Sequence, residues 1–64
     1  MYKVLEVNPP KFPEVSKAYK LILDNDAAPG RQVVIIGPAH KCVMADGTEK
    51  QVRELEPGDE VIMY

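Results

Sequence analysis

His40 and Cys42 are the chain's only histidine and only cysteine, and they lie two residues apart. On a single strand they would share a face, which would allow a contact between them. A nucleophilic Cys–His pair also needs an exposed thiol in electropositive surroundings and a third group that orients the base. Lys41 helps the thiolate slightly, but Val43 and Met44 beside Cys42 indicate burial. We therefore predict that Cys42 is a packed core thiol and that His40, taken alone, is a structural or surface histidine.

Metal and cofactor sites are not expected from these residue types. A closed structural zinc site needs four ligands, and one histidine with one cysteine cannot supply them. A single cysteine also cannot form a disulfide within the chain. The sequence therefore predicts neither a metal nor a cofactor.

An acidic cluster surrounds the predicted turn at Pro57–Gly58 and consists of Glu54, Glu56, Asp59 and Glu60. Paired carboxylates can act as acid and base. Beside a surface turn we expect them instead to be solvated charges, with Lys50 and Arg53 as ion-pair partners of little energetic value.

The composition limits the class of protein. The 64 residues are 45% hydrophobic and 28% charged, as in an average globular domain, and the net charge is −2. A protein that binds nucleic acid through phosphates needs clustered Lys and Arg, so that class is not expected. There is no apolar run near the roughly 20 residues of a membrane helix, and no secretory signal. We expect one small domain or domain fragment, with no membrane or nucleic-acid partner, in the cytoplasm.

Short strands account for most of the chain. Alternating side chains predict a strand over 1–7, which the prolines after Asn8 end. The β-branched run over 33–36 predicts a strand covered on both faces. A turn signal at Pro29–Gly30 precedes this run, and Gly37–Pro38 ends it. Further strands are predicted over 41–45, 48–52 and 60–64, with turn signals between them at Asp46–Gly47 and Pro57–Gly58. The second half is therefore expected to be a compact β-meander.

The segment over 14–26 fits two local structures. Val15, Ala18, Tyr19 and Ile22 have the spacing of an amphipathic helix, and Pro13 would suit its first position. As a strand, the same segment would place Tyr19, Leu21 and Leu23 on one face. The local pattern by itself favours a helix at about 13–25, which would make the protein α+β.

A longer series of features resembles the Hint family, which contains the inteins and the hedgehog-type autoprocessing domains. Gly30-Arg31 precedes a β-branched strand, and Gly37-Pro38-Ala39-His40 follows it. Asp46-Gly47 and the run VRELEPGDEV over 52–61 come next. This order is similar to the part of the family's N-terminal splicing region around its block histidine, and it covers residues 15–64.

The resemblance implies a mostly β fold, a small Hint-like β-meander or partial barrel, in which 19–24 is a strand rather than a helix. It also implies that His40 takes the role of the block histidine, which distorts the scissile peptide and protonates the leaving amine. That catalytic role would require complementation by other pieces. Gly37, at the position of the family's threonine, and Asp59, in its Gly-Asp element, become candidate binding residues.

The departures from the family decide the functional expectation. Gly37 replaces the threonine, Met1 stands where the family has a nucleophilic Cys or Ser, and Ile62-Met63-Tyr64 does not resemble the family's final His-Asn. We therefore expect a non-catalytic Hint-like module that binds another protein. The alternative is an intein-like fragment, active in splicing only with partner pieces that carry the nucleophile and the C-terminal Asn. A homodimer through sheet edges is a further expected mode of association.

Overall fold

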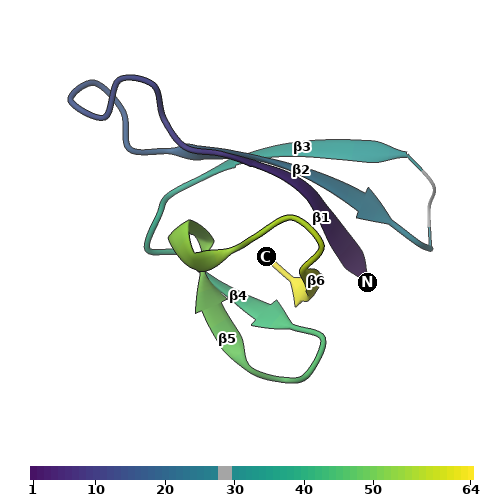
Figure 1. The fold of residues 1–64 in the computed structure, drawn as a ribbon. Coiled ribbons are helices and arrows are strands. Elements are labelled where there is room, and N and C mark those ends of the chain that lie inside the picture. Colours follow the sequence, from purple (N-terminus) through teal and green to yellow (C-terminus); the bar gives the residue numbers. More distant parts are fainter. Residues whose placement is uncertain (28–29) are drawn as a thin grey trace.

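The protein is mostly β. A computed structural model describes residues 1–27 and 30–64, and in these residues it forms six antiparallel strands and one short 3₁₀ helix (Figure 1). The elements are β1 Tyr2–Asn8, β2 Tyr19–Asn25, β3 Arg31–Ile36, β4 Lys41–Met44, β5 Glu49–Gln51, η1 Val52–Glu54 and β6 Glu60–Met63. The predicted strand positions are thereby confirmed, except that η1 takes Val52 from the end of the fifth strand. The turn predicted at Pro29 lies outside the described residues.

The strand order differs from a meander in the second half of the chain. The order across the sheet is β3-β2-β1-β6-β4-β5, so β1 to β3 form a meander while β6 lies between β1 and β4. The predicted order, in which the last three strands are neighbours in sequence order, is therefore wrong. The reason is that β6 follows η1 and the Pro57–Gly58 turn, which return the chain past β4 to the free side of β1.

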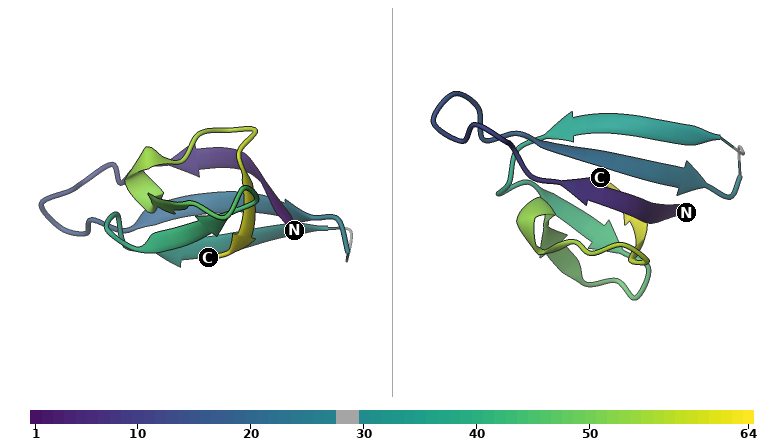
Figure 2. Two further views of the ribbon diagram at one scale, coloured as in Figure 1. Left: turned by 90° about the horizontal axis from the view of Figure 1, so that it is seen from below. Right: turned by 45° about the horizontal axis from the view of Figure 1, so that its top comes forward.

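The sheet curves so that its two halves face each other. Figures 1 and 2 show β1 to β3 on one side of the molecule and the β4–β5 hairpin on the other, with β6 between them. A break in the pairing register between Val4 and Glu6 of β1 marks a bulge, and bulges bend strands. The core lies between the halves and consists of Val4, Leu21, Leu23, Cys42, Met44, Val52, Leu55 and Val61.

The helix considered for 13–25 does not form. Tyr19–Asn25 is strand β2, as the Hint resemblance implied, and it pairs with both β1 and β3. The alternation of the strand buries Leu21 and Leu23 completely, whereas Val15, which a helix would have buried, is 83% exposed. Burial of two leucines on one face outweighs the local helical spacing because the hydrophobic gain follows the area buried.

Strand β3 is less covered than the sequence predicted. Val33 and Ile35 are 57% and 66% exposed, while Val34 and Ile36 on the other face pack against the core. The prediction that this strand is covered on both faces is therefore wrong. The strand lies at one edge of the sheet, and none of the described segments covers its outer face, so β-branched residues stay in contact with solvent.

Candidate functional site

The connection between β3 and β4 holds His40 by its main chain. The His40 amide donates to the Gly37 carbonyl at 3.2 Å, which closes a turn. The Val52 amide then donates to the His40 carbonyl at 2.9 Å, and the Arg53 amide donates to the Pro38 carbonyl at 3.2 Å. These bonds attach η1 to the connection, so the backbone at His40 is fixed from two sides.

The imidazole of His40 is exposed, and within the described residues no hydrogen bond to it is formed. His40 precedes β4, so the alternation that would put it on the face of Cys42 does not extend to it. Cys42 is completely buried, as predicted, and this burial raises the pKa of its thiol. The two residues therefore do not form a nucleophilic pair.

Gly37 ends β3 in open space. A Cβ at this position would meet nothing within 4 Å, and its φ does not lie in the left-handed region. The backbone thus does not require glycine here. The Cβ of a larger residue would lie in open space here.

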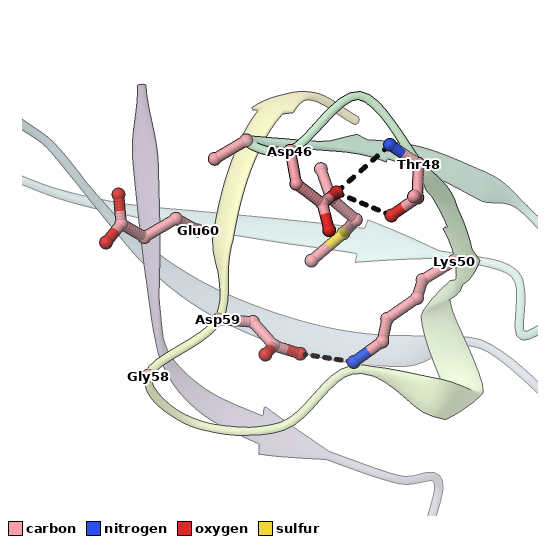
Figure 3. A pocket seen from close by; sticks show the side chains of 8 residues that line it. Asp46, Thr48, Lys50, Gly58, Asp59 and Glu60 are labelled. Carbon is pink, nitrogen blue, oxygen red and sulfur yellow. Dashed lines mark hydrogen bonds and ion pairs between the residues drawn. The ribbon is translucent and has the colours of Figure 1, made fainter.

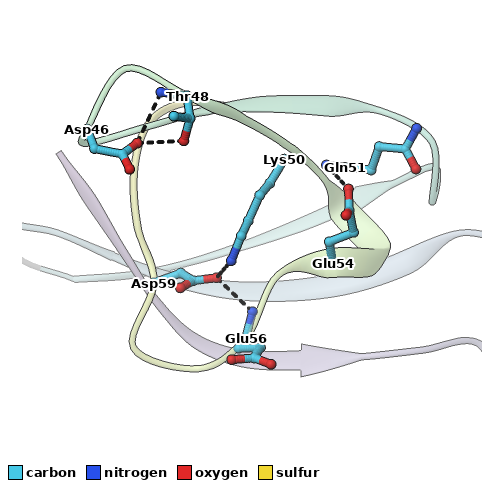
Figure 4. Close-up of polar contacts among 7 residues, drawn as sticks. All are labelled: Asp46, Thr48, Lys50, Gln51, Glu54, Glu56 and Asp59. Carbon is cyan, nitrogen blue, oxygen red and sulfur yellow. Dashed lines mark hydrogen bonds and ion pairs between the residues drawn. The ribbon is translucent and has the colours of Figure 1, made fainter.

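Asp59 has mainly internal contacts (Figure 4). Its Oδ2 accepts from the Lys50 ammonium at 3.2 Å and from the Glu56 amide at 2.9 Å, and the Asp59 amide donates back to the Glu56 carbonyl. The turn that these bonds close contacts β1: the Gly58 amide donates to the Val4 carbonyl, and the Val4 amide donates to the Asp59 carbonyl, both at 2.8 Å. Asp59 therefore stabilises a turn on which the sheet depends.

The acidic cluster is divided among local contacts. Glu54 accepts from the Gln51 amide at 3.0 Å and Asp59 pairs with Lys50, which confirms the expected role of Lys50. Within the described residues, Arg53 forms no ion pair. The same residues contain no group of three or more His, Cys, Asp or Glu side chains able to hold a metal.

A pocket of about 350 Å³ lies between the Asp46–Gly47 turn and the Asp59 turn (Figure 3). Its polar side chains largely bond one another. Asp46 accepts from the Thr48 hydroxyl at 2.6 Å and from the Thr48 amide at 3.0 Å. These two bonds hold the pKa of Asp46 below its ordinary value. Folding thus favours the charged form of Asp46. Its contribution to the free energy of unfolding is lost as the pH falls through its folded-state pKa.

The three predicted site residues lie in two separate turns. Gly37 and His40 share a turn, whereas Asp59 is bonded to Lys50 and Glu56, and among the described residues no hydrogen bond or ion pair joins it to the other two. The feature that sequence reasoning missed is the exposed face of β3. A run of β-branched residues does not show whether its strand lies at the edge or in the middle of a sheet, because this depends on the order of the strands.

Comparisons with known proteins leave the family open: no family model, no curated protein and no solved structure matches the chain. In the part of the chain that the structure describes, no helix is long and apolar enough to span a bilayer.

Replacing Asp59 with alanine should lower the free energy of unfolding by about 1–2 kcal/mol, because the Glu56 amide loses its acceptor and Lys50 loses its partner. Lys50→Met, which removes only a partly exposed ion pair, should cost less than about 1 kcal/mol. Urea unfolding followed by circular dichroism measures both. An equal loss in the two variants would show that the ion pair, and not the turn, is the important contact.

Proposed function

We propose that this chain is a non-catalytic, Hint-like β module that binds another polypeptide by strand addition at β3. The observation that supports the proposal is the open edge of β3, a strand of six residues with Val33 and Ile35 more than half exposed. An extended peptide can add to such an edge through main-chain hydrogen bonds, and exposed side chains give it specificity.

The two edges of the sheet differ in a way that favours β3. β5, at the opposite edge, has only three residues, Glu49, Lys50 and Gln51. Short, charged edges are a common protection against association. β3 has one charged residue, Arg31, and neither a proline nor a bulge in its pairing with β2. Such an unprotected edge is typical of a binding surface.

Gly37 supports the same surface, because a residue without a side chain at the end of β3 leaves room for a partner's backbone. The binding role predicted for Asp59 stays a prediction. The buried free thiol of Cys42 suits a reducing compartment, so we place the module in the cytosol.

A test begins with nine-residue peptides selected on the chain by phage display. With the selected synthetic peptide, the largest amide shifts in a two-dimensional ¹⁵N spectrum should lie in β3. Ile35→Lys should weaken binding at least about tenfold by placing a charge at the edge. Ile62→Lys is the matched control, because Ile62 is 48% exposed on β6, a strand inside the sheet.

Shifts that cluster away from β3, or an equal loss in both variants, would contradict strand addition. Sedimentation of the free chain over a range of concentrations tests whether the partner that adds to β3 is a second copy of this chain. A dimer that Ile35→Lys dissociates would identify another copy of the chain as the occupant of this edge.

A second candidate function is the complemented splicing fragment, and the exposed His40 favours it. The main chain of His40 is held from both sides while its imidazole has no hydrogen-bond partner within the described residues. A general acid that protonates the leaving amine of a docked scissile peptide needs a fixed position and an imidazole free to reach the peptide. The nucleophile and the cyclising asparagine would have to come from partner pieces.

The test of this candidate adds to the chain one segment with an N-terminal Cys block and one segment ending in His-Asn, each fused to a reporter. His40→Ala should slow N-terminal cleavage about a hundredfold or more by removing the acid. Gly37→Thr, whose Cβ would lie in open space, should speed cleavage, and Lys41→Ala should leave the rate unchanged. Cleavage that is absent with all pieces present, or unaffected by His40→Ala, would remove this role.

A further inference from the structure

A cavity of about 400 Å³ lies where the connection between β1 and β2 meets η1. Four prolines form much of its wall: Pro9, Pro10 and Pro13 from that connection, and Pro38 from the connection between β3 and β4. It is open to solvent, since Pro9, Pro13, Lys17 and Arg53 are exposed, and its volume would accommodate a few peptide residues. No other part of the proposed function uses this cavity.

Main-chain hydrogen bonds order parts of the wall. Proline rings lose almost no side-chain entropy when they are covered. The Arg53 amide donates to the Pro38 carbonyl, which fixes one wall to η1. In the connection from β1 to β2, the amides of Val15 and Ser16 both donate to the Phe12 carbonyl, which closes a turn. A pre-formed apolar site reduces the ordering cost of binding.

The charged side chains that line the cavity are both cations, Lys17 and Arg53. Proline has no amide hydrogen, so the side-chain donors that line the cavity are the Tyr19 hydroxyl, the Lys17 ammonium and the Arg53 guanidinium. No acidic side chain lines it, and within the described residues neither cation forms an ion pair. Glu54, the neighbour of Arg53, is already bonded to the Gln51 amide. The cavity is therefore complementary to a ligand in which an anionic group lies next to an apolar group.

We propose that this cavity binds an extended segment of another protein that carries a glutamate or aspartate next to an apolar side chain. The guanidinium of Arg53 matches a carboxylate in a bidentate geometry, and Lys17 adds a second positive charge. The prolines and the ring of Tyr19 cover the adjacent apolar group. The proposal does not depend on strand addition, because none of the residues that line the cavity belongs to β3.

The probe is a capped hexapeptide with a single glutamate between two leucines, and its twin has glutamine in place of that glutamate. Titration of the ¹⁵N-labelled chain should shift the amides of Lys17, Tyr19 and Arg53. The glutamine twin should bind at least about tenfold more weakly, because a charge-assisted hydrogen bond becomes a neutral one. Arg53→Gln and Lys17→Gln should each weaken binding of the glutamate peptide about fivefold or more.

Arg31→Gln is the matched control, because Arg31 is an exposed cation on β3 outside the cavity, and it should leave binding unchanged. The spectrum of each variant reports whether it is folded, and Lys17→Gln, in a surface connection, provides a test that does not depend on η1. Equal binding of both peptides, or full affinity after either cavity substitution, would overturn the proposal. Inorganic phosphate that shifts the same amides more strongly than the peptide would also overturn it. Shifts confined to β3 would reject the cavity and support strand addition instead.

Discussion

The fold depends on the contact between the Pro57–Gly58 turn and Val4 of β1. β6 pairs with β1 through only two residue pairs, and the two hydrogen bonds at Val4 extend this short junction. Gly58 has a φ of 97°, a conformation that other residues adopt only with strain. Both halves of the sheet supply core side chains, so the core forms only when this junction holds the halves face to face.

This architecture leaves its two ends unequal. At one edge of the sheet, β5 is short and polar. At the other edge, β3 has six residues and exposes the apolar side chains of Val33 and Ile35. A chain of this size has little core, and a partner is a common supplement to stability in small domains. The exposed face of β3 and the cavity beside η1 are thus two separate surfaces on which a polypeptide would add buried area. His40 lies on the connection that follows β3, with its backbone fixed and its imidazole exposed.

The sequence was sufficient to predict what depends on local chemistry. The Asp46–Gly47 turn, the burial of Cys42 and the pairing of Lys50 follow from residue types and short spacings. Local pattern alone did not predict strand β2, because the helical spacing beginning at Val15 competed with the strand alternation of Leu21 and Leu23. The exposure of Val33 could not be predicted, since it depends on whether another segment packs on that face of β3, which is decided by the tertiary fold.

The same limit applies to the candidate site. Spacing in the chain suggested a contact between His40 and Cys42, but the strand begins after His40 and turns only the cysteine inward. The proline-lined cavity joins residues from two connections, strand β2 and η1, and no single stretch of sequence contains its pattern. Its cations, Lys17 and Arg53, line the same cavity only because of the tertiary fold.

We infer that the isolated chain folds by itself and leaves the β3 edge of its sheet open for a partner strand. Amide hydrogen exchange, measured residue by residue by NMR on a sample of known solution mass, tests it most directly. We expect a dispersed spectrum, slow exchange at the core residues Leu21 and Leu23, and fast exchange at the amides of β3 that point away from β2. A collapsed spectrum, or β3 amides all protected in a monomer, would contradict it.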